Sequence, residues 1–360
     1  MSVIASAAPI PVTRTSSPRS HPAQDALGFG KYFADHMLLV DYEEGRGWSD
    51  ARIVPYGPIP LDPAASVLHY GQAMFEGLKA YRLADGNIAL FRPDRNAHRM
   101  ASGAARLSIP AIDEQLFVQG IAQLVAADAD WVPSAPGTAL YVRPTIIATE
   151  PFLGVRASKS YLFYVITGPV GAYYAGGLKP VRIWVERERV RAVKGGIGAA
   201  KAAANYVASL QVAEQARERG CDQVLWLDAI THEHLEEVGT MNLCLVIDGT
   251  LITPPLGGSI LPGVTRDTVL TLAGDWGLPV EERPISITEV RDAHARGTLQ
   301  EVFGVGTAAV IQTVGTLSSD EGDMVIDGGA VGPIAQRLYD TITRIQYGLD
   351  PDPRGWRVII

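Results

Sequence analysis

A chain of 360 residues with 47% hydrophobic and 19% charged residues is typical of a globular protein, and its length favours two domains. The net charge of −8 and the lack of any lysine- or arginine-rich run argue against nucleic acid and anionic membrane surfaces as partners. No stretch approaches the roughly 20 apolar residues of a membrane span, and two cysteines are too few for a disulfide framework and fit a reducing compartment.

Residues 1–25 are small, polar and rich in proline, with no acidic residue before Asp25. An organellar transit peptide shares this content of arginine and serine and this lack of acids, but four prolines interrupt any amphipathic helix. We therefore expect a mobile leader on a cytoplasmic, bacterial-type protein, and an organellar leader stays open as an alternative.

Residues 26–170 alternate short β-rich runs with one helix. Apolar residues at helical spacing from Leu116 to Val125 predict a helix in "DEQLFVQGIAQLVAADADW". Runs rich in β-branched and aromatic residues predict strands at "NIALFRP", "ALYVRPTIIAT" and "YLFYVITGPV". We interpret 26–170 as a small N-terminal domain, followed by a glycine-rich connector at 171–178.

The second half, 179–360, restarts with the strand "VRIWVERERV" and is expected to form the larger domain. A helix is predicted from about Ala203 to Arg219, ended by Gly220. Strands at "DQVLWLD" and "NLCLVIDGTLIT", a helix at "TRDTVLTLAGDWG" and the β-rich run "EVFGVGTAAVIQTVG" follow. The predicted fold class is mixed α and β in two domains.

Two lysines, Lys194 and Lys201, stand among glycines and alanines in "VRAVKGGIGAAKAAANYVASL". The chain has six lysines against 25 arginines. Only lysine readily loses its proton to become an amine nucleophile, so a lysine in such a setting indicates chemistry. The pattern alone leaves open which of the two is that amine.

The segment "EVFGVGTAA" matches much of a dinucleotide-binding fingerprint, with Gly304, Gly306 and Ala309 at the required spacing. Such fingerprints open a βαβ unit, whereas here a β-branched run follows. A glycine turn that binds one phosphate group through its amides and the Thr307 hydroxyl is the better interpretation. An NAD-dependent dehydrogenase remains a remote alternative.

A second anion site is indicated by "LPGVTRDTVL". Gly263 predicts a tight turn that places Val264 and Thr265 at the start of a helix, where amide groups are unpaired and the helix dipole is positive. The alternative is that Thr265 only caps its helix.

The segment "THEHLEEVGTMNL" carries five histidines and glutamates, but the histidines are two apart instead of four, so no metal site is predicted. A solvated turn is the expected structure. Glu237 differs from its neighbours because an apolar run follows it at once. A carboxylate that enters a buried strand needs a partner, since an unpaired buried charge is very costly.

Aromatic residues flank cations in "HYGQAMFEGLKAYR" and "ALYVRPT", where Lys79 and Arg143 occur. Each segment alone is compatible with ordinary packing. Together they could form a pocket that pairs an apolar wall with a cation for a substrate carboxylate.

A lysine amine, two phosphate-binding turns and a buried carboxylate that keeps a pyridine nitrogen protonated all suit pyridoxal 5′-phosphate.

From about Phe29 to Gly348 the sequence resembles the branched-chain amino acid aminotransferases, which have the two-domain fold of type IV pyridoxal-phosphate enzymes (D-amino acid aminotransferase-like). The resemblance is carried by "LHYGQAMFEGLKAYR", "LFRPDRNAHRM", "VRAVKGGIGAAKAAANY", "EEVGTMNL", "LPGVTR" and "FGVGTAA". It implies a smaller N-terminal domain and a larger C-terminal domain that binds the cofactor.

The resemblance also implies roles for individual residues. Lys201 matches the Schiff-base lysine, Glu237 the partner of the pyridine nitrogen, and Tyr206 the tyrosine bonded to the cofactor O3′. Cofactor phosphate and ring contacts are implied for Arg99, Leu261, Val264, Thr265 and Thr307. The substrate pocket is implied to contain Tyr70, Phe75, Tyr141, Arg143, Thr240 and Ala308, with Phe29, Val155 and Tyr173 as more distant candidates.

The implied activity is reversible amino transfer between L-leucine, L-isoleucine or L-valine and 2-oxoglutarate, with glutamate and 2-oxo acids as the other reactants. A homodimer is expected from the family, with Tyr70 reaching the neighbour's pocket. The alternatives within the same class are a D-amino acid aminotransferase and an aminodeoxychorismate lyase. A non-catalytic interaction protein is the alternative outside enzymes.

Overall fold

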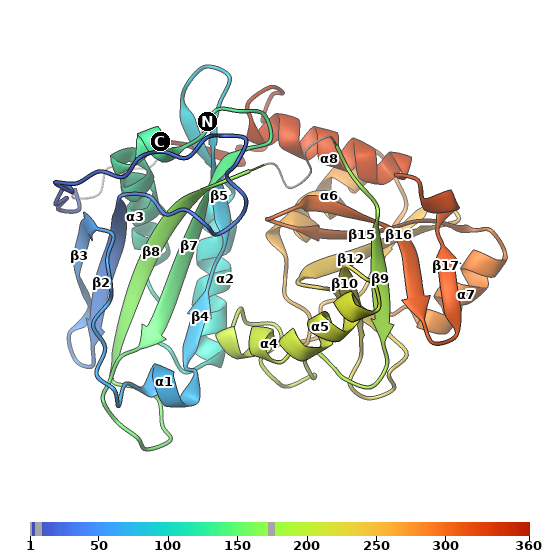
Figure 1. The fold of residues 1–360 in the computed structure, drawn as a ribbon, viewed down its shortest axis with the longest axis horizontal. Helices are drawn as coiled ribbons and strands as arrows, with labels where there is room; N and C mark the ends of the chain where they lie inside the picture. The colour runs from blue at the N-terminus through green and yellow to red at the C-terminus, as the bar shows by residue number, and fades with distance from the viewer. Residues whose placement is uncertain (1, 4–8, 172–176) are drawn as a thin grey trace. The chain divides into compact units, whose positions relative to one another are not determined.

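The computed structural model describes residues 2–3, 9–171 and 177–360, and the chain folds as two compact units (Figure 1). The first unit comprises Met1–Tyr173, Ala200–Ala204 and Arg344–Ile360, and the second comprises Tyr174–Ala199 and Asn205–Thr343. The expected division at 171–178 therefore describes only part of the chain. The segment that contains Lys201 and the C-terminal residues belong to the first unit, although the sequence assigns both to the second half.

The first unit is built on one mixed sheet in which the described strands follow the order β1-β18-β6-β5-β7-β8-β2-β3, with β4 paired to β7. β18 lies between β1 and β6, which explains why the C-terminal residues belong here. The strands are β1 (Ser2–Val3), β2 (His36–Glu43), β3 (Gly47–Pro55), β4 (Ala73–Phe75), β5 (Leu78–Arg82), β6 (Ile88–Phe91), β7 (Ala139–Ala148), β8 (Ser160–Val170) and β18 (Arg357–Ile359).

The helices of the first unit are α1 (Ser66–Tyr70), α2 (Pro93–Arg106), α3 (Glu114–Ala127) and the short 3₁₀ helix η1 (Ala129–Trp131). The predicted helix α3 begins at an Asp113 cap whose side chain accepts from the Leu116 amide. Phe117, Ile121, Leu124 and Val125 are fully buried in the core that the sheet shares with α2, whereas Leu116 is partly buried. The apolar residues that repeat every 3.6 positions in the sequence thus form the buried face of α3.

The leader predicted to be mobile contains a segment that the structure attaches to β3. Ile53 donates to the Pro11 carbonyl and accepts from the Thr13 amide, both at 2.9 Å. Ile10 is buried, and the Thr15 amide donates to His36 Nε2 at 3.0 Å. Residues 10–15 therefore behave as a short edge addition to the sheet, because alternate apolar residues here can pair with an exposed strand edge.

The second unit contains a closed ring of strands. Its described strands follow the order β11-β10-β9-β16-β15-β12-β13-β14, with β17 on β16, and β11 also pairs with β12. They are β9 (Val181–Glu186), β10 (Gln223–Leu227), β11 (Leu235–Val238), β12 (Met241–Ile247), β13 (Thr250–Thr253), β14 (Val280–Glu282), β15 (Leu299–Gly306), β16 (Val310–Ser319) and β17 (Gly322–Val325). Closure leaves β10, β11 and β12 without free edges.

The helices of the second unit are α5 (Leu210–Glu218), α6 (Val264–Asp275), α7 (Ile287–Ala295) and the 3₁₀ helix η2 (Asp327–Gly329). α4 (Ala203–Val207) and α8 (Pro333–Gln346) each cross a boundary between the units in sequence. The single helix predicted from Ala203 to Arg219 is interrupted, because the Ser209 amide and hydroxyl both donate to the Tyr206 carbonyl. Such local bonds compete with helical ones.

Candidate active site

Lys201 lies immediately before α4, in a segment that pairs with β4. Its carbonyl accepts from the Phe75 amide at 3.1 Å, and its Nζ lies 5.0 Å from the centroid of the Phe75 ring. Burial and the nearby Arg99 charge lower the pKa of the Lys201 amine to about 8, although Glu76 opposes the shift. Lys194, by contrast, is exposed. The structure therefore gives Lys201 the environment of a reactive amine.

Arg99 projects from α2 and forms a buried bidentate pair with Glu76. Arg99 Nε and Nη2 donate to Glu76 Oε1 and Oε2, each at 2.7 Å. Asn96 donates to the same carboxylate at 2.7 Å. Burial is the largest single influence and raises the pKa of Glu76, but the charge and hydrogen bonds of Arg99, the Lys201 charge and the Asn96 hydrogen bond together outweigh it, and the net pKa is lowered. The carboxylate is therefore ionised and fixes the orientation of the guanidinium.

Arg143 and Tyr141 lie two residues apart on β7 and so share one face of the sheet. Arg143 Nη2 donates to the Tyr141 hydroxyl at 2.9 Å, and the Arg143 guanidinium lies 4.5 Å from the Phe75 ring centroid. The Phe29 ring meets the Tyr141 ring edge-on at 4.9 Å. Arg143 Nε is buried and has no hydrogen-bond partner among the described residues. A buried donor of this kind suits an acceptor group on a ligand.

Glu237 lies on β11 in the second unit, with both carboxylate oxygens held. Oε1 accepts from the Leu261 amide at 2.8 Å and from Asn242 Nδ2 at 3.4 Å. Arg191 Nε lies 3.1 Å from Oε2, and both side chains of this pair are buried. The partner that the sequence requires for Glu237 is thus Arg191, which the sequence pattern did not single out.

The loop before α6 is fixed against Glu237 by close packing. Asn242 Nδ2 donates to the Leu261 carbonyl at 2.8 Å. A Cβ atom at Gly263 would lie 1.9 Å from Asn242 Oδ1, so only glycine fits that position. The loop that carries Leu261 therefore approaches Glu237 closely because residue 263 has no side chain.

α6 begins at Val264, and its N-cap is Gly263, which offers no side-chain hydrogen bond to the helix. The alternative that Thr265 only caps this helix is therefore wrong, because Thr265 lies inside the first turn. The first-turn amides and the helix dipole remain suited to an anion.

Thr307 and Ala308 lie in the turn between β15 and β16, which pair antiparallel with Gly306 opposite Val310. A dinucleotide fingerprint requires a strand, a turn and then a helix. The glycine motif of the sequence is instead the tip of a β-hairpin, so the dehydrogenase alternative has no structural support at this motif.

The remaining residues implied by the resemblance occupy varied positions. Tyr206 lies on α4, and Thr240 lies in the exposed turn between β11 and β12. Tyr70, at the end of α1, and Val155 are exposed, and the Tyr70 hydroxyl donates to the Leu153 carbonyl. Tyr173 lies outside the described residues.

Two buried acids were missed as functional candidates. Glu76 is followed by Gly77 within the quoted run "FEGLKA", and an acid in so apolar a run could have prompted a search for its partner. Glu236 also points inward: Ser259 donates to its Oε1, and burial raises its pKa. The other residues of the histidine cluster form a turn around Asp228, as expected, and the described residues contain no group that could hold a metal.

The class IV amino-transferase family model matches residues 73–315, and the chain belongs to this family. This confirms the predicted fold class and the prediction of a transferase. The chain is 54% identical over 341 residues to the branched-chain-amino-acid transaminase 1 of Bacillus subtilis (strain 168), covering 94% of this chain and 96% of that protein.

Two solved structures are also similar. One is the branched-chain aminotransferase of Thermoproteus uzoniensis with norvaline, at 27% identity and a TM-score of 0.74, covering 89% of this chain and 99% of that one. The other is a branched-chain amino acid aminotransferase from T.th. complexed with N-(5′-phosphopyridoxyl)-L-glutamate, at 26% identity and a TM-score of 0.71, covering 89% and 97%. Within the described residues, we find no helix with the length and apolar character to cross a membrane.

Proposed function

We propose that the chain is a branched-chain amino acid aminotransferase that moves an amino group between L-leucine, L-isoleucine or L-valine and 2-oxoglutarate. The observation that carries the proposal is the buried Lys201 amine, whose pKa is lowered to about 8 in a cluster with Phe75 and the Arg99–Glu76 pair. The 54% identical relative from Bacillus subtilis is itself named as a branched-chain-amino-acid transaminase.

The donor set of the chain fits pyridoxal 5′-phosphate. Lys201 would supply the amine that holds its aldehyde, and the Glu237 carboxylate, which is buried with Arg191, suits a protonated pyridine nitrogen. Arg99, Val264, Thr265 and Thr307 would hold the phosphate, Tyr206 the O3′ oxygen, and Leu261 the ring. When bound, the cofactor withdraws electrons from the α-carbon of the substrate.

The residues of the chain then divide the work of the reaction. A Lys201 amine with a pKa near 8 can accept and return the α-carbon proton of the substrate as general base and acid near neutral pH. Glu76 keeps Arg99 oriented, and Arg191 keeps Glu237 oriented. The reaction runs as two half-reactions, first with the branched-chain amino acid and then with 2-oxoglutarate.

Substrate recognition is assigned to the cluster around Arg143. Phe75, Tyr141 and Phe29 provide an apolar wall for an aliphatic side chain, and the unpartnered Arg143 Nε provides a donor for a carboxylate. The resemblance also assigns Tyr70, Thr240 and Ala308 to the pocket, and it implies Val155 and Tyr173 as more distant candidates. The norvaline and phosphopyridoxyl-glutamate complexes of the relatives involve one aliphatic and one acidic amino acid.

A homodimer is part of the proposal. Around Tyr70 the first unit exposes Leu68, Leu153 and Val155, with exposed fractions of 58%, 59% and 88%. Exposed apolar residues gathered in this way are typical of an interface between subunits. We assign Tyr70 and Val155 to a surface that a second copy covers. Light scattering should then give twice the mass of the chain, and Val155→Glu should shift the protein toward the monomer.

The absorption spectrum of the purified protein tests the activity. A yellow band that bleaches with L-leucine and returns with 2-oxoglutarate supports both half-reactions together. Bleaching by D-leucine alone would instead favour a D-amino acid aminotransferase, and lyase activity on aminodeoxychorismate would favour an aminodeoxychorismate lyase.

The buried free thiols Cys221 and Cys244 are consistent with the expected reducing, cytoplasmic location.

A further inference from the structure

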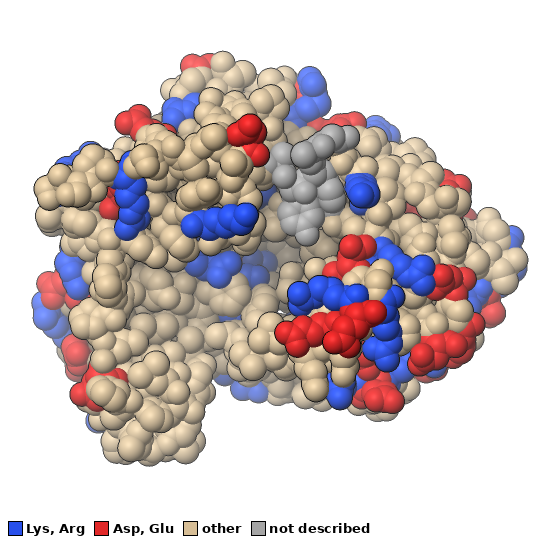
Figure 2. All heavy atoms as spheres, in the orientation of Figure 1, with Lys and Arg blue, Asp and Glu red and all other residues tan. Residues whose placement is uncertain are grey.

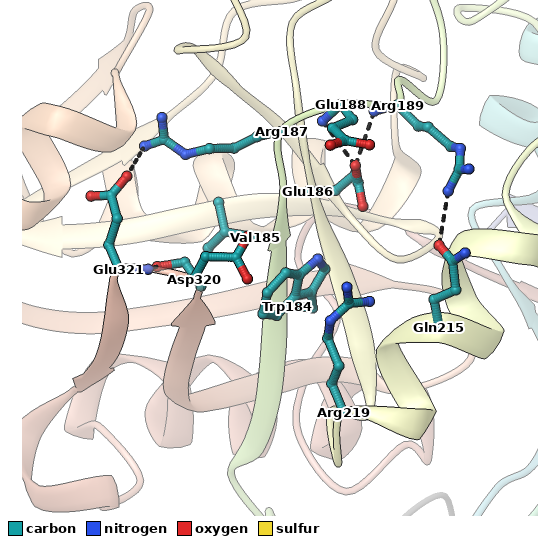
Figure 3. A pocket seen from close by; sticks show the side chains of 11 residues that line it. Trp184, Val185, Glu186, Arg187, Glu188, Arg189, Gln215, Arg219, Asp320 and Glu321 are labelled. Carbon is teal, nitrogen blue, oxygen red and sulfur yellow. Dashed lines mark hydrogen bonds and ion pairs between the residues drawn. The ribbon is translucent and has the colours of Figure 1, made fainter.

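The second unit contains a pocket of about 190 Å³ that none of the residues assigned to the active site lines. It is lined by the end of β9 and the segment after it (Trp184–Arg189), by two residues of α5 and its C-cap, and by the turn between β16 and β17 (Figure 3). We call it the β9 pocket. Pockets for drug-sized ligands occupy roughly 300–1,000 Å³, so the β9 pocket suits a molecule of amino-acid size.

The charges around the β9 pocket are mixed. Three arginines and four acids line it, and Figure 2 shows acidic and basic side chains intermixed over the region of α5 and β9. A simple anion would meet the four carboxylates, and a simple cation would meet the three guanidinium groups. The lining therefore favours a ligand that carries both charges.

Glu186 is the buried acid of the β9 pocket, with 7% of its surface exposed. Its Oε1 accepts from the amides of Glu188 and Arg189, each at 2.9 Å, and this fixes the carboxylate. Its Oε2 has no hydrogen-bond donor among the residues that the structure describes. A carboxylate that is fixed through one oxygen and leaves the other to the cavity suits an ammonium group.

Two cations of the β9 pocket are only weakly engaged by protein acids. The Arg219 guanidinium lies 4.5 Å from the centroid of the Trp184 ring and forms no ion pair within the described chain. Arg187 lies 3.6 Å from Glu233 and from Glu321, beyond hydrogen-bond distance, and its buried Nε has no partner in the described part of the protein. Arg187 points away from Trp184 toward Glu321, so Arg219 is the cation placed to meet a ligand carboxylate beside the indole (Figure 3).

The placement of these groups matches one molecule. Glu186 and Arg219 point toward the same space beside Trp184 (Figure 3). We propose that the β9 pocket binds a free α-amino acid, with its ammonium on Glu186, its carboxylate on Arg219, and its side chain against the Trp184 indole. The proposal does not depend on the transamination reaction.

The ligand would bind a segment that continues to the Glu237 pair. Arg191 follows the pocket residue Arg189 by two positions, and it contacts both Glu237 and the Ser259 carbonyl. Glu233, which lies 3.6 Å from Arg187, is two residues before β11, the strand that carries Glu237. The amino acid would therefore order the backbone that positions the carboxylate assigned to the pyridine nitrogen.

Equilibrium dialysis with labelled L-leucine, L-valine and L-glutamate tests the proposal. The enzyme is first converted to its pyridoxamine form, which has no aldehyde for an amino acid to react with. At least one of the three should bind the wild type at a site that Arg219→Ala weakens at least tenfold. Glu186→Gln should weaken the same site, while still offering an oxygen to the two amides.

Controls separate this site from general charge effects. Arg217→Ala, an exposed arginine of α5 outside the pocket, should bind like the wild type. L-leucinamide, which lacks the carboxylate, and 4-methylpentanoate, which lacks the ammonium, should not compete at the Arg219-dependent site. Equal binding of all three amino acids by wild type and Arg219→Ala would overturn the proposal. Competition by succinate or 4-methylpentanoate at full strength would overturn it too, in favour of a simple anion site.

Discussion

Both units bury acidic and basic side chains, but in opposite proportions. Around Lys201 the first unit gathers Arg99 and Arg143 with Glu76 as the acid, so cations prevail. Around β11 the second unit gathers Glu236 and Glu237 with Arg191 as the cation, so acids prevail. Burying unequal charge is costly unless a further group compensates it. Each cluster is thus suited to a ligand group of the complementary charge.

Removing the central amine of the first unit should have the largest effect. We expect Lys201→Ala to lower turnover of L-leucine by about 10⁴-fold, because no other group is assigned to hold the aldehyde and move the proton. Coupled measurement of glutamate formation checks this. Lys194→Ala is the matched control and should keep full activity. Turnover by Lys201→Ala without any added amine would contradict the assignment.

The next largest effect is expected from the acidic cluster of the second unit. Glu237→Gln keeps an oxygen for the Leu261 amide but loses the charge that faces Arg191. We expect a fall in kcat of about 10²-fold, as for other groups that stabilise developing charge. Steady-state kinetics at saturating cofactor measures it, with Glu233→Gln in the neighbouring turn as control. A fall in kcat of less than twofold would mean that the Glu237 charge is not required for the reaction.

Glu76→Gln tests the first unit, because it removes the only acid assigned to the cluster of Lys201, Arg99 and Arg143. Leaving Arg99 buried without its partner should reduce the free energy of unfolding by roughly 3 kcal/mol, measured by urea denaturation. Glu150, which forms a bidentate pair with Arg156 at the surface, provides the control. Its change to Gln should cost about 1 kcal/mol or less. Equal losses would show that burial of the Glu76 pair has no special weight.

The smallest expected effect is a shift along the pH axis. The apoprotein should capture pyridoxal phosphate through the neutral Lys201 amine, so the capture rate should rise about tenfold per pH unit below pH 8 and level off above it. An ordinary lysine, with a pKa of 10.5, would keep rising beyond pH 8. Because Glu76 raises the pKa of Lys201, Glu76→Gln should move the midpoint lower. A midpoint at the ordinary lysine value would contradict the burial argument.

Elements with a strong period were predictable from sequence. The helix α3, the strands β7 and β8, and the β15–β16 hairpin arise at the expected segments because a buried face repeats every 3.6 or 2 residues. The helix α2 escaped notice because "PDRNAHRMASGAAR" has few large apolar residues, although Met100 and Ala104 face the core. The break after Val207 involves local bonds from the Ser209 amide and hydroxyl to the Tyr206 carbonyl, which the hydrophobic periodicity does not reveal.

The site was predictable where a motif carries it and not where a distant partner completes it. Glu237 was recognised as an acid in need of a partner, but Arg191 is 46 positions away and becomes its neighbour only when β9 and β11 enter the same ring of strands. The pair of Glu76 and Arg99 likewise joins a turn to a helix. Lys201 belongs to the first unit because Ala202 forms a β-bridge with Met74. The two residues are far apart in the sequence, so the sequence does not indicate this contact.

The position of β18 has a consequence for biosynthesis. Its residues 357–359 lie between β1 and β6, yet they are translated after every residue of the second unit. On the ribosome, the second unit can close its ring of strands while the sheet of the first unit still lacks an inner strand. The first unit, although it contains the start of the chain, is therefore the last to be completed.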